Sequence, residues 1–130
     1  MTSAGGCLCG AVRYNILSAP TFVCVCHCDS CRRASGAPMV AWATFEKECI
    51  ALPRAGLQRV ASSPGVLRGH CPRCGTCLTY EKSTRPGEID VTLASMDDPE
   101  AFTPSAHIWV SEKLSWVTIA DGLRQYDTTI

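Results

Sequence analysis

Apolar and polar residues alternate in short runs along most of the chain. This period of two residues is typical of β-strands that bury one face. Gly and Pro separate the runs and indicate turns, as in Pro64-Gly65 and Pro86-Gly87. The pattern predicts strands within residues 12–16, 39–45, 66–70, 76–80, 89–93, 106–110 and 116–119.

Helices are predicted to be few and short. No window of the sequence carries an apolar stripe with a 3.6-residue period over a helical length. A helical turn or two is predicted after Cys28, through Arg32 and Arg33, and another at residues 97–100, where acidic residues and Pro stand at first-turn positions. The predicted fold class is therefore mainly β, and 130 residues is the usual length of a single domain, here residues 1–130.

Charge and hydropathy narrow the partners that we expect. The 12 Lys and Arg residues balance the 12 Asp and Glu residues, without the basic stripe that a nucleic acid would require. No stretch reaches the roughly 20 apolar residues that span a bilayer, and residues 1–6 lack the apolar segment of a signal peptide. We therefore expect a cytoplasmic protein that binds neither nucleic acid nor membranes.

The chain contains ten cysteines, most of them in short clusters. In a reducing cytosol such a density favours metal or thiol chemistry over disulfides. A small β domain also has a thin core and gains stability from a structural metal, because the binding free energy becomes folding free energy.

The first set of cysteines predicts a closed zinc site. Cys71 and Cys74 have the spacing of a zinc knuckle, and Cys7 and Cys9 form a second pair that, on a strand, would point to one face. Each pair is followed by a Gly that permits a tight bend. Four thiolates suit structural zinc; the alternatives are buried small apolar residues or a redox pair.

The second set, Cys26, Cys28 and Cys31, predicts a metal site with one open position. Three thiolates around a zinc ion leave a net charge near −1, which suits the binding of a soft thiolate from a small substrate. Cys24, two residues before Cys26, is an alternative fourth ligand that would close the site. His27, between two ligands, is expected to support or pack against the site rather than to bind metal.

Arg32, Arg33 and His107 are further candidate site residues. The two arginines would offset the negative cluster or bind a carboxylate of the substrate; alternatively, they are solvated surface charges. His107 would donate or accept a proton near the open metal site; alternatively, it is a half-buried histidine of a strand.

The motifs together resemble the glutathione-dependent formaldehyde-activating enzyme family, which also includes centromere protein V. The resemblance rests on Gly6-Cys7-Leu8-Cys9-Gly10-Ala11-Val12-Arg13-Tyr14, Cys26-His27-Cys28-Asp29-Ser30-Cys31-Arg32-Arg33, Cys71-Pro72-Arg73-Cys74-Gly75-Thr76, His107-Ile108-Trp109 and Asp121-Gly122-Leu123. Cys24 and Cys77 are additional to the seven cysteines of the family.

The resemblance implies an Mss4-like β fold with two zinc ions per chain. One would be structural, held by Cys7, Cys9, Cys71 and Cys74, and the other would lie in the active site, held by Cys26, Cys28 and Cys31. It further implies glutathione as the small thiol substrate, adding to formaldehyde to give S-hydroxymethylglutathione.

The function predicted from the sequence is therefore a zinc-dependent carbon-sulfur lyase acting on a glutathione-aldehyde adduct. A motif fixes a fold better than a substrate, so two other hypotheses stay open. One is a non-enzymatic zinc-binding module for a small thiol or a protein partner. The other is a thiol redox protein that uses a disulfide among Cys24, Cys26 and Cys77.

Overall fold

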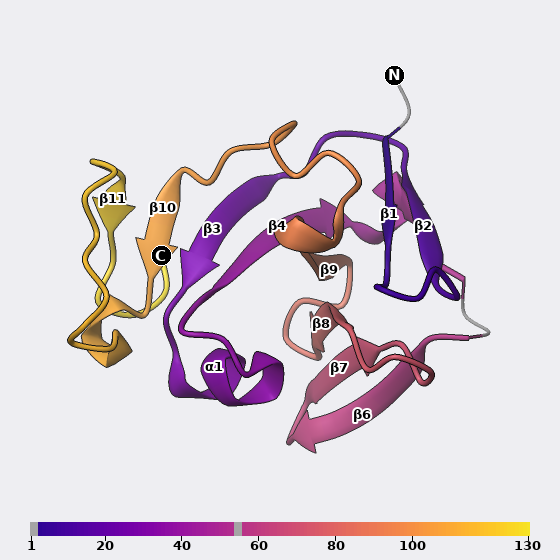
Figure 1. Cartoon of the computed structure of the whole chain (residues 1–130), viewed down its shortest axis with the longest axis horizontal. Helices are drawn as coiled ribbons and strands as arrows, with labels where there is room; N and C mark the ends of the chain where they lie inside the picture. The colour runs from indigo at the N-terminus through magenta and orange to yellow at the C-terminus, as the bar shows by residue number, and fades with distance from the viewer. Residues whose placement is uncertain (1–2, 54–55) are drawn as a thin grey trace.

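The computed structural model describes residues 3–53 and 56–130, and it is mainly β (Figure 1). Three short 3-10 turns, η1 (Lys47–Cys49), η2 (Leu93–Ser95) and η3 (Val110–Glu112), and one helix, α1 (Asp29–Ser35), accompany the strands in these residues. The strands are β1 (Ser3–Gly6), β2 (Arg13–Ile16), β3 (Phe22–Cys26), β4 (Val40–Glu46), β5 (Ile50–Ala51), β6 (Gln58–Ser63), β7 (Val66–His70), β8 (Cys77–Lys82), β9 (Glu88–Thr92), β10 (Ala106–Ile108) and β11 (Arg124–Gln125).

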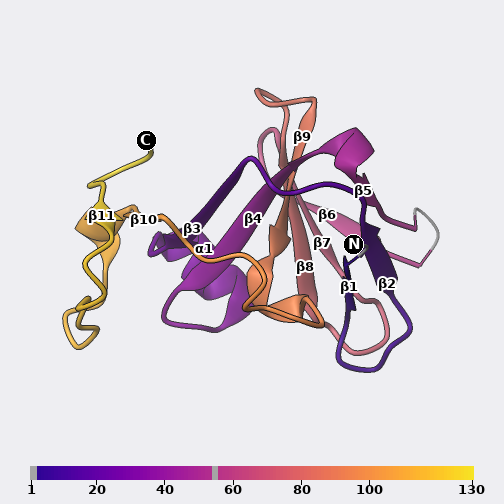
Figure 2. The same ribbon diagram turned by 90° about the horizontal axis from the view of Figure 1, so that it is seen from above.

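The strands form a large sheet and a small one. The large sheet has the order β11-β10-β3-β4-β9-β8-β7-β6, and the small sheet has the order β1-β2-β5. Pairing is antiparallel except at β10, which is parallel to both β3 and β11. Seen from above, the small sheet lies on one side of the large sheet, and β10 and β11 lie at the opposite edge (Figure 2).

The main core lies between the two sheets. Tyr14 and Ile16 of β2 are buried there against Phe45 of β4 and Val91 of β9. Tyr14 also donates or accepts a hydrogen bond with Ser95 of η2, 2.8 Å between the two oxygens. Burial of these apolar side chains holds the small sheet on one face of the large sheet.

The opposite face of the large sheet carries the candidate site. Because side chains alternate along a strand, Cys24, Cys26, Trp42 and Thr44 point away from the main core. Cys24, Cys26 and Trp42 belong to a second, smaller buried cluster. Two residues separate β3 from helix α1, and Gly36, whose φ is 67°, provides the left-handed C-cap of the helix.

The alternation predicts the central strands well. Strands β2, β4, β7, β8, β9 and β10 fall within or beside the predicted segments, and α1 confirms the helix after Cys28. The predicted mainly β fold class is thus confirmed.

Two predicted elements and one local conformation are wrong. Residues 116–119 form no strand: a turn at residues 115–116 leads into a segment without regular structure, and the Lys113 ammonium donates to the carbonyls of Leu114 and Val117. Residues 97–100 form a turn and not a helix, since the Asp98 side chain accepts from the Glu100 amide. Residues 7–9 likewise lie in a turn after β1 and not on a strand.

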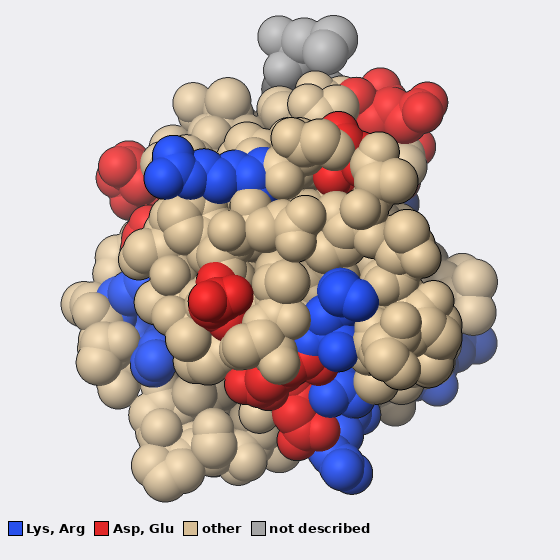
Figure 3. All heavy atoms as spheres, turned by 90° about the vertical axis from the view of Figure 1, so that its left-hand side faces the viewer, with Lys and Arg blue, Asp and Glu red and all other residues tan. Residues whose placement is uncertain are grey.

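Charges of both signs are distributed over the surface. On the side of the molecule that Figure 3 shows, Lys and Arg atoms lie close to Asp and Glu atoms, which agrees with the balanced composition. Within residues 3–53 and 56–130, no helix is both long enough and apolar enough to cross a membrane.

Candidate metal centres and active-site pocket

The first cysteine cluster joins the two sheets. Cys7 and Cys9 follow β1 of the small sheet, and Cys71 and Cys74 follow β7 of the large sheet. Their four sulfur atoms all lie within 4.8 Å of one another. The local turns depend on Gly10 and Gly75, whose φ angles of 82° and 79° favour glycine. The structure therefore brings together the four residues that the sequence predicts as one site.

The spacing of these sulfurs suits a tetrahedral ion. The Sγ atoms of Cys7 and Cys9 are 3.6 Å apart, and those of Cys9 and Cys71 are 3.8 Å apart. A tetrahedral zinc ion with Zn–S bonds of about 2.3 Å separates its sulfurs by about 3.8 Å. The Cys71 sulfur also accepts from the amides of Arg73 and Cys74, both at 3.4 Å, which fixes its position in the turn. This cluster could hold a metal ion.

The second cluster lies where β3 passes into α1. Cys26 ends β3, Cys28 caps the N-terminus of α1, and Cys31 lies in its first turn. The amide of Cys31 donates to the Cys28 sulfur at 3.3 Å. The three sulfurs lie within 4.8 Å of one another, so this cluster could also hold a metal ion. The short spacing in the sequence is sufficient to bring the three sulfurs together, because the chain turns at the N-cap of α1.

Of the three thiols of this cluster, that of Cys31 has its pKa lowered, whereas those of Cys26 and Cys28 have theirs raised. Hydrogen bonds from Cys26 and Cys28 lower the pKa of Cys31 to about 3, and the guanidinium of Arg68 acts in the same direction. Hydrogen bonds with Cys28 and Cys31 raise the pKa of Cys26. The Arg68 guanidinium lies 3.9 Å from the Cys31 sulfur and 4.9 Å from the centre of the Tyr80 ring. A cation held against an aromatic ring thus faces the sulfur cluster.

The second cluster opens into a cleft of about 650 Å³ on the outer face of the large sheet. Its lining includes all three cluster cysteines, the aromatic residues Phe22, Trp42, Tyr80 and Trp109, and the charged residues Arg68, Lys82, Arg85, Glu88, Asp90 and Glu112. A cleft of this size with apolar walls and a few charged groups is typical of a small-molecule site.

Cys24 lines the same cleft but is not part of the cysteine cluster. It is 4% exposed, and burial raises its pKa to about 12. Its sulfur does not satisfy the mutual 4.8 Å separation that groups Cys26, Cys28 and Cys31. All ten cysteines are free thiols in the structure.

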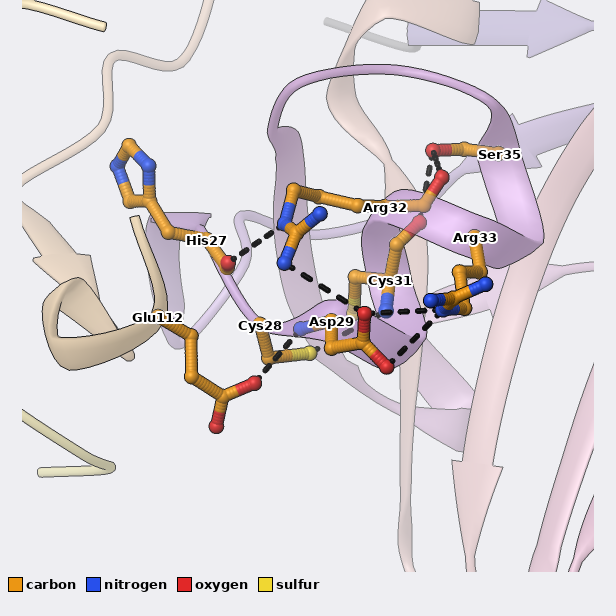
Figure 4. Close-up of polar contacts among 8 residues, drawn as sticks. All are labelled: His27, Cys28, Asp29, Cys31, Arg32, Arg33, Ser35 and Glu112. Carbon is orange, nitrogen blue, oxygen red and sulfur yellow. Dashed lines mark hydrogen bonds and ion pairs between the residues drawn. The ribbon is translucent and has the colours of Figure 1, made fainter. Parts of the chain in front are cut away.

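Arg32 and Arg33 lie beside the cluster but outside the lining of the cleft (Figure 4). The Arg32 side chain donates to the carbonyl of His27 at 3.3 Å, and both arginines pair with Asp29. The Asp29 amide in turn donates to Glu112 at 2.8 Å, which ties α1 to η3. The structure thus places the two arginines in the contacts that fix the cysteine segment.

His107 lies on the face of the large sheet opposite the cleft. It pairs with Val25 of β3, whereas its neighbours on β10 pair with Cys24 and Cys26. Its Nδ1 is 2.8 Å from Nε2 of His27, and its Nε2 is 2.7 Å from a carboxylate oxygen of Asp121. The three side chains form a hydrogen-bonded chain, and both histidines are buried.

The sequence did not indicate the residues that complete the cleft. Arg68, Tyr80 and Asp90 lie on β7, β8 and β9 and reach the same face because their strands are neighbours in the sheet. The sequence shows these residues only as polar positions within alternating runs. The order of the strands in the sheet is needed to show that the three side chains lie together.

The fold and the site define a class of protein: mainly β, with two cysteine clusters that could hold metal ions, one of them open to a cleft. The model of the family described as glutathione-dependent formaldehyde-activating enzyme matches residues 2–112. The chain belongs to this family, which confirms the resemblance of its motifs.

Individual relatives agree with this assignment. The chain is 26% identical over 110 residues to a protein of Schizosaccharomyces pombe described as an uncharacterized lyase, and the match covers 84% of this chain and 79% of the relative. The crystal structure of a Rhodobacter sphaeroides protein superposes with a TM-score of 0.59 at 20% identity, covering 95% of this chain and 98% of the other. That structural likeness supports the fold.

Proposed function

We propose that the protein is a zinc-dependent carbon-sulfur lyase that makes or breaks the adduct of glutathione with an aldehyde such as formaldehyde. The observation that carries the proposal is the group of three cysteines, Cys26, Cys28 and Cys31, at one end of an open cleft. Family membership supplies glutathione and formaldehyde as the substrate class, and the name of the yeast relative agrees with lyase chemistry.

The reaction is an addition and its reverse. The sulfur of glutathione forms a bond to the carbonyl carbon, the π electrons of the carbonyl move to its oxygen, and that oxygen takes up a proton. Overall, the thiol proton moves from sulfur to oxygen. In the reverse direction the carbon-sulfur bond breaks and the hydroxyl proton is lost.

Both cysteine clusters suit zinc. Four thiolates would close a tetrahedral site, whereas the three thiolates of the second cluster would leave one position open for a sulfur ligand, where zinc would supply Lewis-acid stabilisation of a thiolate. We assign the structural ion to Cys7, Cys9, Cys71 and Cys74 and the active-site ion to the other three ligands. Two zinc ions per chain are therefore expected.

Residues around the cleft suit the charges that change during addition. The Arg68 guanidinium offsets the negative charge of the cluster, a role that the sequence suggested for Arg32 and Arg33. Tyr80 offers a neutral O–H donor within the lining, and burial raises its pKa further above neutral pH. The proton-transfer role predicted for His107 stays a prediction, which a substitution can test.

Exchange spectroscopy on glutathione and formaldehyde tests the proposal. We expect the zinc-loaded protein to accelerate interconversion with S-hydroxymethylglutathione beyond the spontaneous rate, and Cys31→Ser to abolish the acceleration. Cys49→Ser is the matched control, because Cys49 lies outside both clusters.

No acceleration by the zinc-loaded protein would refute the enzymatic function. Binding of glutathione without acceleration would instead support the alternative of a zinc module that binds a small thiol. A zinc-free protein that stays folded and cycles between thiol and disulfide with glutathione would support the redox alternative.

A further inference from the structure

The cleft has a second polar end, remote from the cysteine cluster. Along β4, Val40 pairs with Cys26, whereas Thr44 pairs with Asp90 of β9. The two positions are four residues apart, which corresponds to about 13 Å of extended strand. Trp42 lies between them on the same face and lines the cleft. A ligand whose sulfur is held at the cysteines would therefore pass an apolar wall before it reaches the second end.

A buried hydrogen-bonded series fixes a guanidinium at this end. The Thr44 hydroxyl donates to one oxygen of Asp90 at 2.6 Å, and Asp90 is 8% exposed. The Arg85 guanidinium donates to the other oxygen at 2.7 Å. A buried carboxylate needs such partners, and here they also orient Arg85 toward the cleft that it lines.

Charges of both signs are accessible at this end. The side chain of Arg85 is 35% exposed and that of Glu88 is 36% exposed, and a distance of 3.4 Å separates their nearest nitrogen and oxygen atoms. Lys82 adds a second cation to the lining. A ligand with only a carboxylate would be repelled by the acidic side chains at this end, and one with only an ammonium would be repelled by the cations. A group that carries both charges complements the whole end.

We propose that the Arg85–Glu88 end of the cleft binds the zwitterionic amino-acid head of the thiol substrate. Arg85 and Lys82 face the α-carboxylate, and Glu88 faces the α-ammonium. Glutathione carries such a head at its γ-glutamyl end, on the far side of an amide from the cysteine that bears the sulfur. The inference rests on the proposed function. It adds which part of the substrate this end of the cleft recognises.

Calorimetric titration of the zinc-loaded protein with two thiols tests the inference. The thiols are glutathione and N-acetylcysteinylglycine, which keeps the thiol and both amides but replaces the amino-acid head with a methyl group. We expect glutathione to bind about tenfold or more tightly, as charge-assisted hydrogen bonds of this kind imply. Equal affinities in the unmodified protein would overturn the inference without the need for any variant.

Substitutions test whether the preference for glutathione over N-acetylcysteinylglycine arises at the Arg85–Glu88 end. Glu88→Gln and Arg85→Lys should each reduce the preference for glutathione to about threefold or less while leaving the affinity for N-acetylcysteinylglycine unchanged. Arg59→Gln is the matched control, because Arg59 forms a similar ion pair with Glu81 at 2.9 Å outside this cleft. A preference that persists in both variants would contradict the assignment to this end.

The outcome is separable from that of the proposed function. If both thiols bind equally and the protein still accelerates adduct formation, the lyase function stands and the inference is wrong. If neither thiol binds and no acceleration occurs, both fail. A preference for glutathione without acceleration would support the inference and refute catalysis.

Discussion

The side chains of His27, His107 and Asp121 lie behind the sulfur cluster and link three segments of the chain. Burial lowers the pKa of His27, and the hydrogen bond from His107 lowers the pKa of Asp121. His27 is fully buried, and its Nδ1 has no partner within the described part of the chain. Since His27 lies between two cysteines of the cluster, this arrangement supports the cysteine segment from the face opposite the cleft.

His107→Gln tests whether the histidine acts in stability or in proton transfer. Its side chain does not line the cleft, so we expect the free energy of unfolding to fall by about 1–3 kcal/mol, the usual cost of leaving buried polar partners unpaired. Chemical denaturation measures this change. In the exchange assay at a temperature where the variant is folded, kcat should fall less than tenfold.

A different result would support the role predicted from the sequence. General acid-base catalysis contributes about 10²–10⁴-fold, so a loss of that size with unchanged stability would place His107 in the reaction. Asp121→Asn serves as a companion variant, because it removes the charge from the partner of His107 while keeping a side chain of the same shape.

The sequence identifies individual metal-ligand candidates better than it identifies their surroundings. Cys26, Cys28 and Cys31 lie within six positions of one another, so a single helix cap is enough to group them. Arg68 is 37 positions from Cys31, and its contact depends on the packing of β7 beside α1. Spacing therefore predicts local clusters, whereas long-range neighbours require the fold.

The close approach of β1 to β2 makes Gly5 sensitive to substitution. A Cβ atom at this position would clash with the Tyr14 hydroxyl and lie 2.8 Å from the Ser95 carbonyl. Because Tyr14 is buried and hydrogen-bonded to Ser95, its side chain cannot move aside without cost. We expect Gly5→Ala to lower the free energy of unfolding by about 1–3 kcal/mol, as overpacking does.

Thermal and chemical unfolding measure the effect. Gly87→Ala is the matched control, since a Cβ at Gly87 would meet no atom within 4 Å and its backbone is not left-handed. If both substitutions had the same effect, the tight packing of β1 on Tyr14 would not be the cause.

An ion pair between β2 and the turn after η2 predicts a pH dependence. The Arg13 guanidinium donates to Asp97 at 2.9 Å, and this hydrogen bond lowers the pKa of Asp97 below its ordinary value of 3.8. A carboxyl group with a lowered folded-state pKa stabilises the fold above the unfolded-state value, and this contribution is lost as the pH falls through the folded-state value.

Arg13→Gln should therefore lower the urea midpoint slightly at pH 6, because both partners are about half exposed. The difference from the unmodified protein should shrink as the pH falls below 3.8 and protonates Asp97. Lys47→Gln, at a separate surface ion pair, controls for general effects of lost charge. A difference that does not change with pH would contradict the pairing.

Alternation of apolar and polar residues predicts strands that have one buried and one polar face. It does not predict strands whose two faces are both buried or both exposed. Strand β3 reads Phe-Val-Cys-Val-Cys without polar alternation, because its two faces meet the main core and the cleft cluster. Strand β6 is a polar edge strand whose residues are mostly exposed. Residues 116–119 alternate, but this pattern accompanies an irregular segment after a turn, in which only Val117 is buried.

The two cysteine clusters contribute differently to the whole molecule. The four-cysteine cluster connects the small sheet with the large sheet, and Cys9 and Cys71 are 62 positions apart. The three-cysteine cluster lies within one segment at the wall of the cleft. Metal in the first cluster should therefore stabilise the fold, whereas metal in the second should serve chemistry.

Sulfur coordination measured by X-ray absorption distinguishes the two sites. The zinc-loaded protein should show an average of about 3.5 sulfur ligands per zinc, the mean of four and three, with a light atom completing the second site. Glutathione should raise the average toward four.

Substitutions separate the roles of the two sites. The Cys31→Ser variant should lose about one zinc per chain and stay folded, whereas Cys71→Ser should lower Tm strongly, because it disrupts the connection between the sheets. Four sulfurs at every zinc without glutathione, reduced by Cys24→Ser, would place Cys24 on the metal and favour a closed binding module over a lyase.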